Sequence, residues 1–223
     1  MAPAAKPSAR PANEGGAGRA YGDPMTTTAL TAPTAPTADD PRNLRDARAA
    51  YWAEHGFGAD GGEALRWVPV EVLGLTLYLP NTDARRRAVR VHDLHHVVTG
   101  YRTDLTGEAE IAAWELATGC ARMPAALVLN LLALAVGMLR APRRMLAAWA
   151  RGRRSANLYG VPYGDALLGR RTDEVRRELG LDRPAAPAGA ADVAGLAITA
   201  LLGGLLLALP LVLLVVLVVA VVA

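Results

Sequence analysis

This chain of 223 residues has one cysteine and one phenylalanine, and its positive and negative charges nearly balance. The single cysteine, Cys120, excludes an intrachain disulfide, and a thiol among alanines is typical of a small buried residue. Lysine and arginine number 24 against 21 acids, and this net charge of +3 gives no support for nucleic-acid binding. We therefore expect no nucleic-acid partner.

The N-terminal segment lacks hydrophobic periodicity. Residues 1–45 are rich in alanine, proline and threonine, and they lack the continuous apolar run of a secretory signal. The sequence therefore predicts a disordered tail over 1–45, a folded domain over 46–183 and a linker over 184–192.

Charge is absent from residues 193–223. A bilayer core needs about 20 apolar residues, so this segment predicts a C-terminal transmembrane helix, with Pro210 leaving open one or two spans. Arginines precede the segment and no charge follows it, which predicts a single-pass anchor in the cell membrane with the folded domain on the cytoplasmic side. Six arginines and no acid lie between Arg140 and Arg154, a face for water or for anionic lipid.

The domain itself is patterned mainly for helices. Residues 67–80 predict a loop or a short extended piece, because their alternation is weak. Residues 124–139 are apolar nearly all round and predict a buried central helix or one wall of a lipid cavity. The fold class expected is mainly α, an orthogonal or bundle-like helical domain. The residues expected to open helices are Asn81 or Thr82, Thr106, Pro124 and Thr172, with a further helix over Met145–Arg151 and stops at Gly100 and Gly180.

Three of the four histidines stand together in the stretch HDLHH, residues 92–96. On a helix, His92, Asp93 and His96 fall within about 100° of arc, opposite an apolar face. His95 falls at the edge between the two faces, where it is either an edge residue or a proton carrier. The alternative reading is a polar helix face with nothing bound.

Two histidines one helical turn apart offer two imidazoles to one ion. Asp93 adds an oxygen ligand or orients an imidazole, and Glu108 begins the next helix after a short turn that brings it beside His96. The set His92, Asp93, His96 and Glu108 suits Zn²⁺, and Fe²⁺ or Mn²⁺ are alternatives.

Two other metal sites use similar letters. HDLHH also fits a box of membrane di-iron desaturases, which need many more histidines than the four present. The doublet His92-Asp93 also fits a metal-dependent phosphohydrolase of the HD type, for which His55 is the one further histidine. The HD-type phosphohydrolase stays as an alternative.

The pattern His92, Asp93, His96, then eleven residues and Glu108, resembles the signature of the coenzyme Q (ubiquinone) biosynthesis protein 4 family. TGYRTD and DEVRRELGL resemble it too. The resemblance implies a helical, membrane-associated protein whose four motif residues bind a divalent metal, usually zinc, and whose apolar cavity binds an isoprenoid lipid.

The resemblance further implies an enzyme, a metal-dependent carboxy-lyase (oxidative decarboxylase) that removes the ring carboxylate of a polyprenylated hydroxybenzoate and hydroxylates that carbon. The alternative is a non-catalytic isoprenoid-binding scaffold for other quinone-biosynthesis enzymes, and a homodimer stays open. Residues 128–139 would line the prenyl tail. The candidate catalytic residues are Tyr101, Arg102 and His95.

Overall fold

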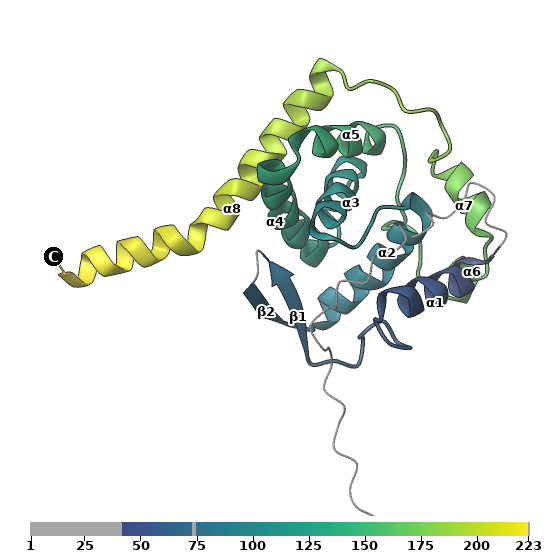
Figure 1. Ribbon diagram of the computed structural model, residues 1–223, viewed down its shortest axis with the longest axis horizontal. Coiled ribbons are helices and arrows are strands. Elements are labelled where there is room, and N and C mark those ends of the chain that lie inside the picture. Colours follow the sequence, from purple (N-terminus) through teal and green to yellow (C-terminus); the bar gives the residue numbers. More distant parts are fainter. Residues whose placement is uncertain (1–41, 73–74, 223) are drawn as a thin grey trace, which may run out of the picture. The chain divides into compact units, whose positions relative to one another are not determined.

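The computed structural model describes residues 42–72 and 75–222, and within them the chain is mainly helical, as predicted. The predicted tail over 1–45 lies outside the described residues except for its last four. Figure 1 shows the helices gathered around α3, with a small hairpin beside them. The helices are α1 (Leu44–His55), α2 (Asp83–Thr99), α3 (Leu105–Thr118), α4 (Pro124–Arg140), α5 (Pro142–Gly152), α6 (Asp165–Leu168), α7 (Thr172–Glu178) and α8 (Ala190–Val222).

The segment predicted as a loop or short extended piece is a β-hairpin. Strands β1 (Trp67–Val72) and β2 (Leu75–Pro80) pair antiparallel, with Trp67 opposite Pro80. Trp67 is 54% exposed and Tyr78 is 66% exposed. Because these bulky apolar side chains are exposed, the segment lacks the apolar–polar alternation from which strands are predicted.

Helix α2 has the ends that the sequence predicted. The Thr82 hydroxyl accepts a hydrogen bond from the Arg85 amide, and Gly100 ends the helix in the left-handed conformation with a φ of 75°. The predicted helix from Pro124 is confirmed as α4, and the one over Met145–Arg151 as α5.

Two predicted caps are wrong. Helix α3 is capped by Asp104, whose carboxylate accepts from the Gly107 amide at 2.8 Å, while Thr106 lies inside the helix. Thr172 is the first residue of α7, and its buried hydroxyl has no hydrogen-bond partner among the described groups. At α3, Asp104 caps as well as a threonine does and lies two residues before Thr106, whereas α7 begins after Arg171 with no side-chain cap.

Helix α3 is the centre of the domain, and α4 is not. Trp114 of α3 is fully buried in a core cluster with Leu94 of α2 and Val175 of α7. Ala109 and Ala113, on another face of α3, belong to a second cluster formed with α4, α5 and α8. The buried central helix predicted for residues 124–139 is therefore wrong, because α4 packs on α3 and α8 but leaves Val128 and Leu139 exposed. The alternative, one wall of a lipid cavity, stays a prediction.

Cys120 is confirmed as a buried residue. It is 2% exposed and packs with Ala88 and Ala126. Burial raises the pKa of its thiol to about 11, so this cysteine is a packing residue rather than a nucleophile.

Helix α8 runs continuously from Ala190 to Val222, so the chain forms one long apolar helix rather than two short ones. Its part from Ala190 to Pro210 is long and apolar enough to cross a membrane by length and composition. Figure 1 shows α8 bending along its length, and Pro210, which donates no backbone hydrogen bond, lies within it.

The first half of α8 packs against the domain. Leu196 is 4% exposed in the cluster shared with α4 and α5. Asp192 forms an ion pair with Arg154 at 2.9 Å. At Gly203 the helices come so close that a Cβ atom would lie 2.3 Å from the Leu131 carbonyl oxygen. Only glycine permits this approach of α8 to α4.

We expect Gly203→Ala and Gly204→Ala to change stability in opposite directions. A Cβ at Gly204 meets no atom within 4 Å, so alanine gains up to about 1 kcal/mol of helix propensity there. At Gly203 the Cβ meets a backbone carbonyl, and overpacking costs about 1–3 kcal/mol. Denaturant unfolding of the full chain in detergent measures both, and equal effects would contradict the close α4–α8 contact.

Candidate metal centre

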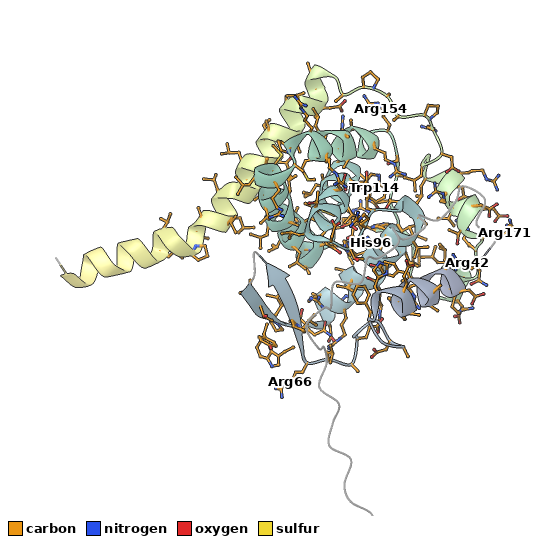
Figure 2. The ribbon with its side chains drawn as sticks, in the orientation of Figure 1. Arg42, Arg66, His96, Trp114, Arg154 and Arg171 are labelled. Carbon is orange, nitrogen blue, oxygen red and sulfur yellow. The ribbon has the colours of Figure 1, made fainter. Side chains whose placement is uncertain are left out.

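Three side chains from α2 and α3 converge on one point. The Nε2 atoms of His92 and His96 lie 3.1 Å apart. The Glu108 carboxylate lies 3.3 Å from each, through Oε2 to His92 and Oε1 to His96. Within the described part of the chain, these form the one group of three or more His, Cys, Asp or Glu side chains close enough to share an ion. Figure 2 marks His96 within the helical domain.

A tight connection between α2 and α3 brings Glu108 to the histidines. Helix α2 stops at Gly100, and the Asp104 cap starts α3 within a few residues. Gly107 lies so close to the preceding chain that a Cβ there would be 2.2 Å from the Arg102 carbonyl oxygen. This contact sets Glu108, the next residue, in the first turn of α3 facing α2.

The protein fixes the tautomer of both histidines. The Nδ1 atom of His96 lies 2.9 Å from the Tyr101 carbonyl oxygen, which can only accept, so Nδ1 carries the hydrogen. The Nδ1 atom of His92 lies 2.9 Å from Oε1 of Glu115, and it also donates. In a neutral imidazole the other nitrogen, Nε2, then has a free lone pair, and both Nε2 atoms face Glu108.

Acceptor atoms therefore point at one another in the centre of the group. Burial alone would raise the pKa of Glu108, but the imidazoles of His96 and His92 lower it to about 2, so the carboxylate is ionised. Burial alone would lower the pKa of His92, but Glu115 and Glu108 outweigh it and raise that pKa. Two lone pairs and a carboxylate this close repel unless a proton or a cation lies between them.

The donor set and its spacing fit a small divalent cation. Ligand bonds of about 2.0–2.2 Å in a tetrahedron give donor–donor distances of about 3.3–3.6 Å, close to those between these three side chains. Two imidazoles and one carboxylate form a ligand set used by catalytic zinc and by ferrous iron. Both histidines also have the hydrogen-bonded Nδ1 that metal-bound histidines require.

Asp93 lies next to this group but points elsewhere. It is 6% exposed, and its Oδ2 accepts a hydrogen bond from the Trp52 indole nitrogen at 2.8 Å. Burial raises the pKa of its carboxyl. The structure thus brings together three of the four residues expected as ligands, while Asp93 as the fourth stays a prediction.

His95 is not the edge residue that the helical wheel placed there. It is fully buried, with its ring edge-on to Trp114 and Tyr159. Its Nδ1 donates to Glu115 at 2.6 Å and its Nε2 accepts from the Leu158 amide at 2.9 Å. Burial lowers the pKa of His95, so the imidazole is neutral, and both of its nitrogens are engaged by the protein.

Glu115 is the site residue that sequence reasoning missed. It is fully buried two turns after Glu108, and its Oε1 accepts from His92 and His95. Its Oε2 accepts from Asn130 at 2.6 Å and from the Tyr159 hydroxyl at 2.7 Å. Burial opposes ionisation, but His92 and His95 hold the pKa of Glu115 well below its usual range. The sequence signal was an acid amid the apolar residues of α3, with Asn130 as its polar counterpart in α4.

Residues 84–185, which run from the second residue of α2 to beyond the end of α7 and include His92, His96, Glu108 and Glu115, match the model of one protein family. The family is the coenzyme Q (ubiquinone) biosynthesis protein Coq4. Residues 84–185 are a Coq4 domain. Neither a curated protein nor a solved structure matches the chain. The matched family is one of ubiquinone biosynthesis, and the match covers fewer than half of the 223 residues.

Tyr101 and Arg102 lie beside the candidate metal centre in different ways. Tyr101 offers its carbonyl oxygen to His96, and its ring lies under the Arg151 guanidinium at 5.3 Å. The Arg102 side chain is exposed and pairs with Asp104 at 2.6 Å. A substrate-contacting role for either stays a prediction.

Nothing in the described residues supports the HD-type phosphohydrolase. His55, the one further histidine, lies in α1 with its Nδ1 2.8 Å from the backbone carbonyl of Tyr51. It is not part of the group formed by His92, His96 and Glu108. The Tyr51 ring instead stacks on His96, with ring centres 5.5 Å apart, and covers one side of the centre.

We expect Glu115→Gln to destabilise the metal-free protein strongly. The glutamine amide has an NH2 group where Glu115 has an acceptor oxygen, so buried donors would lose their acceptor and face another donor. We expect this to lower the free energy of unfolding by about 3–5 kcal/mol. Glu110→Gln on the same helix is the control, because Glu110 pairs with the exposed Arg144 and such pairs contribute about 0–1 kcal/mol. Denaturant unfolding compares the two, and equal losses would refute the importance of the network.

The same variant tests how Glu115 acts on the metal. Where Glu115→Gln still folds, we expect divalent-metal affinity to fall about 10–100-fold, the usual effect of losing a hydrogen-bond partner of a metal-bound histidine. Glu110→Gln should bind metal as the unaltered protein does. Titration with Zn²⁺ measures both, and unchanged affinity in Glu115→Gln would show that Glu115 serves folding alone.

Proposed function

We propose that this protein is a membrane-bound, metal-dependent enzyme of ubiquinone biosynthesis that removes the ring carboxylate of a polyprenylated hydroxybenzoate and leaves a hydroxyl on that carbon. The observation that carries the proposal is the convergence of His92, His96 and Glu108, with both imidazoles fixed in the tautomer that a metal needs. The Coq4 domain supplies the pathway.

The reaction needs a cation and an oxidant. The carboxyl group leaves as carbon dioxide, and a hydroxyl whose oxygen comes from water takes its place. The substrate as a whole thereby loses two electrons, which a dioxygen co-reactant accepts together with two protons to become hydrogen peroxide. A bound divalent ion, Zn²⁺ or alternatively Fe²⁺ or Mn²⁺, would supply positive charge for the carboxylate and phenolate of the substrate.

The chain's own residues hold the geometry for this chemistry. Glu115 and the Tyr101 carbonyl orient the two imidazoles, and the Glu108 carboxylate completes the donor set. The Tyr51 ring, stacked on His96 and partly buried, covers one side of the group. Arg102, exposed beside the turn and paired with Asp104, is the residue we propose to meet the carboxylate of an aromatic acid.

Membrane attachment by α8 is part of the proposal. The apolar stretch from Ala190 to Pro210 supports it, and the arginines that precede α8 favour a cytoplasmic domain. Of the predicted basic face, Arg144 and Arg154 are already paired with acids, at Glu110 and Asp192.

A non-catalytic lipid-binding scaffold is the second candidate. It is favoured by the exposed apolar face of α4 and α8, where Leu139 is 81% exposed and Leu201 63% exposed, because such a surface binds lipid without any chemistry. Partner enzymes of quinone synthesis and a homodimer belong to this candidate.

Metal content and quinone intermediates together test the enzyme proposal. We expect one divalent ion per purified chain, lost in His96→Ala and Glu108→Ala. His55→Ala is the control, because His55 lies outside the group. In a strain deleted for the gene, the carboxylated precursor should accumulate, and only the unaltered protein and His55→Ala should clear it.

The candidates give different outcomes. A protein that never retains metal refutes the site. A strain that accumulates no carboxylated precursor refutes the reaction, and rescue of ubiquinone synthesis by His96→Ala would favour the scaffold instead.

A further inference from the structure

Helices α4 and α8 share an apolar surface that the rest of the domain does not cover. Val128 is 45% exposed and Leu139 is 81% exposed on α4. On α8, Ile198, Leu201 and Leu205 are each at least 60% exposed. Bulky apolar side chains in such number along two adjacent helices are unusual on a surface that faces water.

The two helices are fixed side by side. Gly203 brings α8 against the Leu131 carbonyl of α4, as the close Cβ approach shows. Further towards its start, α8 places Gly195 against the Trp149 ring of α5. Helix α8 is therefore part of the domain along its first half and cannot leave α4 without breaking these contacts. In Figure 1 α8 runs beside α4 and α5.

This surface bears no charged side chains, and charged residues follow directly beyond its edge. Residues 124–139 of α4 carry no charge, and Arg140 and Arg143 follow at once. The one acid near the start of α8, Asp192, is neutralised by Arg154. An uncharged face bordered by arginines has the charge distribution of a surface in contact with a bilayer.

We propose that the outer face of α4 contacts the hydrocarbon of the membrane together with α8, so that the pair enters the bilayer as one unit and α8 is not a free tether. The proposal rests on the membrane attachment proposed above. Its occupant is lipid acyl chain, because the face is continuous with a helix of membrane-spanning length and carries no charge.

Helix α4 thereby separates the bilayer from the metal centre. On its inner face Asn130 is 5% exposed and donates to Oε2 of Glu115, which holds His92 through Oε1. Its outer face bears Val128. A prenylated substrate whose tail remains in the bilayer needs to move only its polar head group past this one helix.

Single introduced cysteines test this contact. The native Cys120 is buried with a raised pKa, so it gives little background labelling. Val128→Cys and Leu139→Cys report on α4, Leu205→Cys reports on α8, and Arg87→Cys, at an exposed position of α2, is the control. Each full-length variant is labelled with an environment-sensitive fluorophore in vesicles of phosphatidylcholine and phosphatidylglycerol. All four positions are exposed, and thermal unfolding verifies that each variant is folded.

Quenching by lipids with a nitroxide on the acyl chain is the measurement. We expect severalfold stronger quenching at positions 128, 139 and 205 than at 87. Strong quenching at position 205 overturns the inference if position 128 or position 139 is not quenched as well, and it leaves α8 as a lone anchor. If quenching at position 205 is as weak as at position 87, α8 does not enter the bilayer, and the membrane attachment in the proposed function is refuted.

Discussion

The buried carboxylate of Glu115 is the interaction on which the domain depends. A fully buried acid is costly unless its oxygens are satisfied, and here His92, His95, Asn130 and the Tyr159 hydroxyl all donate to it. These donors come from α2, α4 and the segment before α6. The network therefore forms only when those elements are in place around α3, and it selects one arrangement among the many that apolar packing would allow.

The candidate metal centre depends on that network. Glu115 accepts a hydrogen bond from Nδ1 of His92, and the Tyr101 carbonyl accepts one from Nδ1 of His96. Both Nε2 atoms therefore face Glu108 before any ion binds. Such preorganisation removes the cost of turning the rings when the ion binds. The same carboxylate, that of Glu115, therefore both stabilises the fold and orients a histidine of the site.

The elements whose determinants are local could be predicted from the sequence. The ends of α2 follow from Thr82 and Gly100, and the pairing of His92 with His96 follows from one helical turn. Features set by packing could not be predicted. The wheel gave His95 an angle but not the Trp114 and Tyr159 rings that enclose it. Among the hairpin side chains that the structure describes, none is buried, so burial imposed no sequence pattern on them. Helix α4 is apolar on both faces because one packs inside the domain and the other is exposed.

Helix α4 touches the interior network with Asn130 and the outside with Val128. Hydrogen bonds weaken steeply once the donor and acceptor part by more than a few tenths of an ångström. A small sideways displacement of α4 would therefore lengthen the bond to Glu115 and loosen the ring that Glu115 holds. Under the proposed membrane contact, lateral pressure on the outer face of α4 would therefore reach the imidazole of His92 through this one helix.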